Sequence, residues 1–245
     1  MVTYAYLGQC TFALDFDGTR IVTDPHLSSL GPEGMRAYPA PCTLMEAAPD
    51  VVVISHSHAD HLDPKTLNPY IEAGGKAPIY APAPECEWLE KLGAPNIGRA
   101  KAEQSFTVGN VTITPIPCAH TELHTDENGD YRELSYIIKG CGKTVFFGGD
   151  MSLYEGLTER LEQEHFDLLL IPCNGRDEKR TSMNIIGNTN EHEAAQLAVR
   201  LNAPYAPMHH DVYAFNGCSV ELIEAAAKAA GAQLLLPKVN VPEAL

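Results

Sequence analysis

Three histidines and two aspartates lie within nine consecutive residues, SHSHADHLD at 55–63. The histidines are His56, His58 and His61, and Asp60 stands between the last two. An exposed loop needs polar side chains, but it has no requirement for imidazole at spacings of two and three. Because imidazole nitrogen is the commonest protein ligand of zinc and related metals, the cluster predicts a metal site.

Further histidines and aspartates follow apolar segments elsewhere in the chain. The segments at 51–55, 112–119, 144–149 and 204–208 are each expected to form a strand. Because strand ends of one sheet can converge at one edge, we expect the residues after them to meet in space. Beyond the first cluster, these residues are His120, Asp150, His209 and His210.

The mixture of ligand types predicts the chemistry. Imidazole nitrogen suits zinc and iron, whereas carboxylate oxygen suits harder ions such as manganese, so a site with both can hold two ions. Two ions roughly 3.5 to 4 Å apart share a water, lower its pKa to about 7 and stabilise the attacking and leaving oxygens of a hydrolysis. Adjacent residues at a strand end face opposite sides, so either His209 or His210 is expected to bind metal while the other packs or contacts substrate. The predicted ligands are His56, His58 and His120 for one ion, Asp60, His61 and one of the adjacent pair for the second, and Asp150 as a bridge.

Length and composition are typical of a globular protein. The 245 residues are 44% hydrophobic, which suits one large domain or two small ones. No linker, repeat or low-complexity tract divides the chain, so we predict one α/β domain over residues 1–245. No apolar run reaches the roughly 18 to 20 residues of a membrane span, and the N-terminus lacks the pattern of a signal peptide. We therefore expect a cytoplasmic protein with no membrane partner.

Charge and cysteine content argue against other classes. A formal net charge of −15 would repel a phosphate backbone, so we expect no nucleic-acid partner. The seven cysteines are scattered singly with no Cys-x-x-Cys pair. Neither a disulfide framework nor a zinc ribbon is therefore predicted, and most cysteines are expected in the core.

Apolar runs and turn residues predict the elements. Asp17 and Gly18 predict a hairpin turn, residues 25–49 a long loop, and Asn190 with Glu193 a helix capping box. The expected strands also include 2–8, 11–16, 20–24, 77–81, 110–118, 134–139, 143–149, 167–172 and 232–237. The expected helices are 65–74, 83–93, 154–164, 191–202 and 221–231, with a polar loop at 173–189.

The ordered series His56-x-His58-x-Asp60-His61, then His120, Gly149-Asp150 and His209, resembles the full motif series of the metallo-β-lactamase superfamily over essentially the whole chain. This resemblance implies a four-layer αββα sandwich with the site at one edge. It also implies one or two divalent ions, Mn²⁺ or Zn²⁺, and His209 rather than His210 as the ligand.

Longer motifs resemble one branch of that superfamily. SHSHADHLDPKT, NGRD with a following GNTN, and PMHHDVYAFN are similar to the L-ascorbate-6-phosphate lactonase-like proteins. The resemblance implies a hydrolase that opens a small anionic, phosphorylated sugar-like lactone such as L-ascorbate 6-phosphate. Asp150 and His58 stand where other branches have cysteine and glutamate, so those chemistries are not favoured. The chain is shorter than the lactonase itself, so parts of the substrate pocket are expected to differ.

Residues beside the predicted ligands are candidates for other roles. Asp60 is the candidate general acid/base. The alternative is that, as a metal ligand, it only orients the nucleophile. Asp24 and Asp211 are candidates to accept the outer N–H of a ligand histidine and fix its tautomer. The alternative for each is a simple turn residue.

The polar loop at 173–189 is the candidate substrate-binding segment. Guanidinium groups match the geometry of phosphate and carboxylate, and a local basic group in so acidic a chain would hold an anionic small molecule. The alternative is a solvated loop with a salt bridge to Asp177 or Glu178. The candidate substrate-binding residues are Asn174, Arg176, Arg180 and Asn188, together with His210, and Asn184 lies in the same loop.

Two other functions remain open at this stage. The same dinuclear centre can support a phosphodiesterase, and a chain can keep the fold as a non-enzymatic metal-binding scaffold. The presence of all seven predicted ligands favours an enzyme. The expected partner is a small anionic substrate, a homo-oligomer is left open, and the remaining histidines are treated as ordinary polar residues: His26, His124, His165 and His192.

Overall fold

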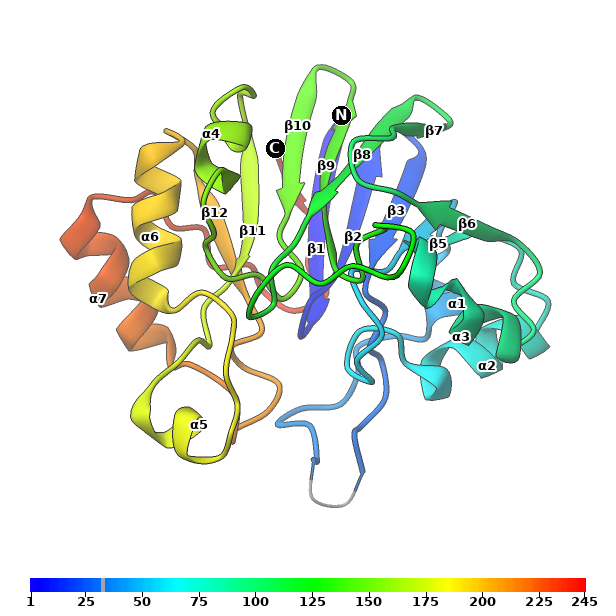
Figure 1. Cartoon of the computed structure of the whole chain (residues 1–245), viewed down its shortest axis with the longest axis horizontal. Coiled ribbons are helices and arrows are strands. Elements are labelled where there is room, and N and C mark those ends of the chain that lie inside the picture. Colours follow the sequence, from blue (N-terminus) through cyan, green and yellow to red (C-terminus); the bar gives the residue numbers. More distant parts are fainter. Residues whose placement is uncertain (32–33) are drawn as a thin grey trace.

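The computed structural model describes residues 1–31 and 34–245 and shows two β-sheets packed face to face (Figure 1). The largest cluster of buried side chains lies between them and takes Tyr4 and Phe12 from one sheet and Tyr136 and Phe147 from the other. Two further clusters pack helices against the opposite faces of the sheets. The predicted αββα arrangement is therefore confirmed.

The first sheet is antiparallel at one side and parallel at the other. β1, β2 and β3 pair antiparallel, whereas β3, β4, β5 and β6 pair in parallel. The predicted hairpin turn is present, with positive φ at Asp17 and Gly18 as a two-residue turn of type I′ requires. The strand order is β13 (Glu243–Ala244), β1 (Val2–Gly8), β2 (Thr11–Phe16), β3 (Thr19–Thr23), β4 (Val51–Val53), β5 (Ile79–Pro82) and β6 (Ile97–Ala100).

The second sheet is also mixed. Its order is β12 (Tyr205–Met208), β11 (Leu168–Pro172), β10 (Lys143–Phe147), β9 (Leu134–Gly140), β8 (Val111–Pro117) and β7 (Phe106–Val108). β10, β11 and β12 are parallel, and β8 and β10 are both antiparallel to β9. The carboxyl ends of β8, β10, β11 and β12 therefore lie at one edge of this sheet.

Helices cover both outer faces. Buried residues of α1 (Leu44–Ala47), α2 (Pro64–Glu72) and α3 (Cys86–Lys91), the last preceded by the 3₁₀ turn η1 (Ala83–Glu85), pack on the first sheet. Those of α4 (Leu157–Leu161), α6 (Glu191–Arg200) and α7 (Val220–Ala230) pack on the second. The capping box of Asn190 and Glu193 forms as predicted. The short helix α5 (Glu178–Ser182) lies apart from these layers in Figure 1.

Some predicted elements differ from the structure. The expected strand at 232–237 is wrong: Leu234 makes only an isolated bridge to Tyr205, and the last strand is β13, which pairs with β1. The apolar residues there pack on the core without a continuous ladder. The two expected loops contain α1 and α5, because Thr43 and Asp177 cap these short helices. Residues 32–33 of the first loop lie outside the described part.

Cysteines and helix lengths complete the comparison with the sequence. Four of the seven cysteines are buried, so most do lie in the core, and all seven are free thiols: Cys10, Cys86, Cys118 and Cys173 are the buried ones. Within residues 1–31 and 34–245, no helix combines the length and apolar character needed to cross a bilayer.

Candidate metal centre

The seven predicted ligand residues lie after four strands whose carboxyl ends meet between the two sheets. β4 leads into the histidine cluster, β8 into His120, β10 into Asp150 and β12 into His209. In each of three overlapping groups, the candidate ligand atoms all lie within 4.8 Å of one another. The groups are His56, His58, His120 and Asp150; Asp60, His61 and His209; and Cys10, His61 and Asp150.

The spacing of these atoms matches that of ligands around one ion. His61 Nε2 is 3.3 Å from Asp150 Oδ1, and His209 Nε2 is 3.2 Å from Asp60 Oδ2 and 3.4 Å from Asp150 Oδ2. Two atoms each about 2.0–2.1 Å from a tetrahedral zinc are roughly 3.3 Å apart. Imidazole nitrogens and carboxylate oxygens that converge from four segments at this spacing fit a divalent metal.

The turn after β4 aims the first histidines. The amides of His61 and Leu62 both donate to the carbonyl of His58 at 2.9 Å, which folds the segment back on itself. Asp63 then caps α2, with Pro64 in the first turn where proline is tolerated. The ring centroids of His56 and His58, which precede this turn, are 4.5 Å apart.

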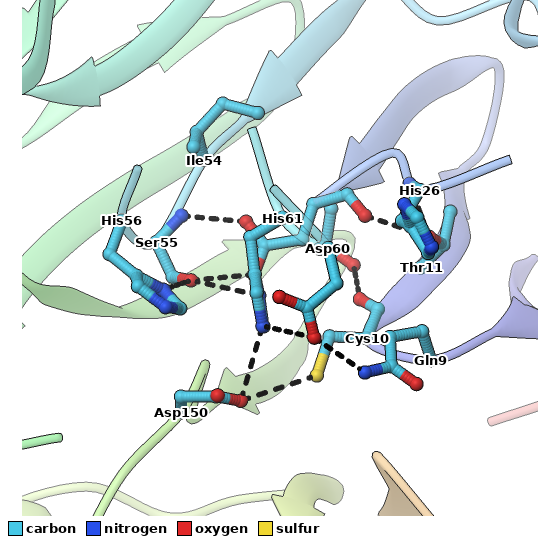
Figure 2. A network of polar contacts seen from close by, with 12 residues as sticks. Gln9, Cys10, Thr11, His26, Ile54, Ser55, His56, Asp60, His61 and Asp150 are labelled. Atoms are coloured by element: carbon cyan, nitrogen blue, oxygen red, sulfur yellow. Dashed lines mark hydrogen bonds and ion pairs between the residues drawn. The ribbon is translucent and has the colours of Figure 1, made fainter. Parts of the chain in front are cut away.

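Asp24 fixes the orientation of His61. Its carboxylate accepts from His61 Nδ1 at 2.6 Å and from the amide and hydroxyl of Ser55, each at 2.6 Å. With Nδ1 directed at Asp24, Nε2 of His61 faces Asp60 and Asp150 (Figure 2). Asp24 therefore accepts the N–H of a predicted ligand histidine, which is the contact that its candidate role requires.

Within residues 1–31 and 34–245, four buried ring nitrogens have no hydrogen-bond partner, and three of them belong to predicted ligands: Nε2 of His56, Nε2 of His61 and Nδ1 of His120. Leaving a buried polar atom unsatisfied costs about 1–3 kcal/mol. The hydroxyl of Ser55 lies 2.9 Å from the other nitrogen of His56, so only Nε2 is open to a ligand. A cation bound at these nitrogens would remove that cost.

Charge within the cluster sets its protonation. Burial alone would raise the pKa values of Asp60 and Asp150, but the neighbouring His61 and His209 hold both well below the usual range. Burial would lower the pKa of His209, but Asp150 and Asp60 raise it to about 9. The carboxylates are therefore ionised at neutral pH, and a binding cation would replace protons on the histidines.

A cavity of about 210 Å³ opens beside the centre. Asn174 and Asn188 line it, as the sequence suggested, and Asn216 joins them. Asn188 donates to Asn174 and Asn174 to Asn216, both at 2.9 Å, which leaves the buried Oδ1 of Asn188 without a partner. These amides form a neutral wall that accepts or donates hydrogen bonds.

The two candidate arginines have other partners and are not among the residues lining that cavity. Arg176 pairs with Glu193 and donates to the carbonyl of Asn188 at 2.9 Å. Arg180 pairs with Asp177, which is the salt bridge of the alternative interpretation. These contacts show that the two guanidinium groups stabilise the loop at 173–189.

His210 and Asp211 also differ from expectation. His210 is not in the cavity lining and stacks against Tyr6, with ring centroids 5.9 Å apart. The carboxylate of Asp211 accepts from the hydroxyls of Tyr6 at 2.6 Å and Tyr38 at 2.8 Å. It therefore braces the segment after β12 and is not hydrogen-bonded to a ligand histidine.

Sequence reasoning missed three residues at the site. Gln9 donates to Asp60 at 2.8 Å, and Cys10 lies 3.8 Å from Asp150 (Figure 2). His26, treated as an ordinary polar residue, is fully buried and contacts Asp63 at 3.0 Å and Tyr213 at 2.5 Å. None of the three stands in a cluster along the sequence, so nothing there marked them.

A family model described as the Beta-lactamase superfamily domain matches residues 19–210, a span that contains all seven predicted ligands. The chain belongs to the β-lactamase superfamily. The crystal structure of a possible metal-dependent hydrolase from Veillonella parvula superposes with a TM-score of 0.81 at 17% identity and covers 100% of both chains. At this identity the likeness shows the fold, and it agrees with the predicted sandwich.

Curated relatives of this superfamily member differ in length. An uncharacterized protein of Mycobacterium tuberculosis is 31% identical over 69% of this chain, and the chain spans about half, 47%, of that relative. A UPF0173 metal-dependent hydrolase of Methanoculleus marisnigri is 29% identical over 85% of this chain and 80% of its own length. An N-acyl-phosphatidylethanolamine-hydrolyzing phospholipase D of Caenorhabditis elegans is 25% identical over 68% of this chain and 52% of its own.

Proposed function

We propose that this superfamily member is a metal-dependent hydrolase acting through the seven converging residues. The observation that carries the proposal is the convergence of His and Asp ligand atoms to within 4.8 Å of one another, with Nε2 of His56 left without a hydrogen-bond partner. A relative named as a metal-dependent hydrolase, matched over 85% of this chain, supports it. When bound, one or two divalent ions, Mn²⁺ or Zn²⁺, supply Lewis acidity that activates water and polarises the bond to be cleaved.

The chain's own residues divide the remaining work. Asp60, ionised and facing the cavity, is the group placed to accept a proton from the attacking water. Asn174, Asn188 and Asn216 are placed to orient the substrate by hydrogen bonds from one side of the cavity. His61, fixed by Asp24, keeps its free nitrogen toward the centre.

For the substrate we propose a small lactone, with L-ascorbate 6-phosphate as the specific candidate. The support is the resemblance of the motifs around residues 55–66, 174–177 and 207–216 to the lactonase-like branch. A cavity of about 210 Å³, smaller than the roughly 300–1,000 Å³ of pockets for drug-sized ligands, limits the substrate to a small molecule. Because no lysine or arginine is among its lining residues, an anionic group would have to be neutralised by the metal ions.

One experiment tests the hydrolase and the substrate separately. Protein purified without chelators is assayed for metal per chain, then for opening of L-ascorbate 6-phosphate lactone and of an uncharged lactone after Mn²⁺ or Zn²⁺ loading. Metal-dependent opening supports the hydrolase, and preference for the phosphorylated lactone supports the substrate. Bound metal without turnover on any ester would favour the scaffold alternative.

A phosphodiesterase is the second candidate. The relative that supports it is the phospholipase D of Caenorhabditis elegans, which by its name cleaves a phosphodiester. The same metal centre can stabilise a phosphoryl transition state with little change. Faster turnover of bis(p-nitrophenyl) phosphate than of either lactone would favour this candidate.

We also propose that residues 1–245 act as one domain, because the central core contains side chains from both sheets.

A further inference from the structure

Gln9 reaches the metal centre from a strand that carries no predicted ligand. It follows β1 with φ of 57°, in the left-handed region that L residues rarely adopt, and it is 1% exposed. Its carbonyl accepts from the amide of His209 at 2.9 Å, so the backbone here is tied to a predicted ligand. Such strain is maintained where the surrounding structure requires the position.

The side-chain amide of Gln9 lies among the groups proposed for the second ion. Its Nε2 is 2.8 Å from Asp60 Oδ2 and 2.9 Å from His209 Nε2. Ligand atoms at right angles around an octahedral ion, each about 2.0–2.1 Å from it, are roughly 2.9 Å apart. The end of this amide therefore lies at ligand spacing from Asp60 Oδ2 and His209 Nε2, and Figure 2 shows its contact with Asp60.

We propose that Gln9 is a further metal ligand, through its side-chain carbonyl oxygen, for the ion held by Asp60, His61 and His209. This inference rests on the proposed metal-dependent function. The amide NH₂ has no lone pair to offer and donates instead to the carboxylate of Asp60. A half-turn about the last side-chain bond exchanges nitrogen for oxygen at the same place and presents the oxygen to a cation.

The amide turns in place because the rest of the residue is held. The backbone of Gln9 is hydrogen-bonded to His209 and the residue is buried, so its side chain is held beside the centre. The consequence is a difference between the two positions. His56, His58 and His120 make the first rich in nitrogen, whereas Gln9 makes the second richer in oxygen and shifts it toward harder ions such as Mn²⁺.

Two other roles for Gln9 predict different changes in affinity for the second ion when the amide is removed. If the amide only competes with the ion for Asp60, its removal will tighten binding of the second ion. If it only fills space, an isosteric apolar side chain will leave binding unchanged. A ligand role predicts that removal weakens the second ion alone.

The test titrates the metal-free protein with Mn²⁺ and with Zn²⁺ by calorimetry, with bound metal measured after dialysis. Wild type is expected to bind two ions, Gln9→Leu to bind the second about tenfold more weakly with the first unchanged, and Gln9→Glu to bind it more tightly. The matched control is Gln196→Leu on the exposed face of α6, which should match wild type. Circular dichroism of each metal-free variant checks the fold.

The outcomes separate this inference from the function beneath it. Two ions in Gln9→Leu with wild-type or tighter affinity would overturn the ligand role and leave the metal centre standing. A single ion in wild type would also overturn it, because no second ion needs a ligand. No bound metal in wild type would overturn the proposed function itself.

Discussion

His61 donates its Nδ1 proton to Asp24 at 2.6 Å, with both side chains fully buried. This one hydrogen bond joins the end of β3 to the turn after β4 and decides which nitrogen of His61 faces the centre. Partners of this kind typically change metal affinity 10- to 100-fold when removed.

Asp24→Asn should therefore weaken metal binding about 10- to 100-fold. An asparagine keeps the size of the side chain but accepts the ring proton less strongly and offers only one oxygen to His61 and Ser55. Metal affinity is measured by competition with a chromogenic chelator. Asp17→Asn, a change at an exposed aspartate of the hairpin turn, is the control and should bind like wild type. Equal affinity in both variants would show that Asp24 does not support the ligand.

Gly187→Ala should displace His120 and lower metal affinity. A Cβ at this position would collide with Nδ1 and the carbonyl oxygen of His120, and the backbone has φ of +110°. Gly129→Ala is a matched control, because its φ of +81° carries similar strain while its Cβ would meet nothing within 4 Å. A loss of affinity in Gly187→Ala alone, with equal loss of stability in the two variants, assigns the effect to His120.

Arg176→Ala should raise KM for phosphorylated and uncharged lactones by similar factors. Its guanidinium holds the carbonyl of Asn188 and pairs with Glu193, so it positions the cavity wall without lining the cavity. Glu193→Gln weakens the same support from the other side and should give the same pattern. An increase in KM confined to the phosphorylated substrate would instead mean direct contact with the phosphate.

Sequence alone was sufficient for the parts of the site that repeat a local rule. His56, His58 and Asp60 stand in one turn after β4 of the first sheet, whereas His120 and Asp150 follow β8 and β10 of the second. Strand-end convergence accounts for each set, and the packing of the two sheets brings the sets together. The strands and helices predicted one α/β domain, whereas the four-layer order came from the resemblance to the metallo-β-lactamase superfamily. The candidate metal ligands could thus be recognised from their pattern in the sequence.

The remaining features depend on pairings between distant segments. Arg176 is paired by Glu193 on α6 and Asp211 by Tyr6 on β1, so neither was available for the predicted role. Gln9 reaches Asp60 across 51 positions and has no motif of its own. Such contacts depend on how the two sheets pack, which single-sequence patterns do not specify.

Metal removal should lower the thermal stability of the protein. Without an ion, Nε2 of His56 lacks a partner, and the charges of Asp60 and Asp150 are offset by the neighbouring His61 and His209. A free metal concentration of 100 times the Kd raises the free energy of unfolding by about 2.7 kcal/mol, because the ion binds only the native state. Differential scanning calorimetry with chelator and after Mn²⁺ or Zn²⁺ addition measures the change in Tm. His56→Ala should lose most of the metal-induced increase, whereas His165→Ala, a histidine outside the metal centre, should keep it. An identical Tm with and without metal in the wild-type protein would contradict binding at this centre.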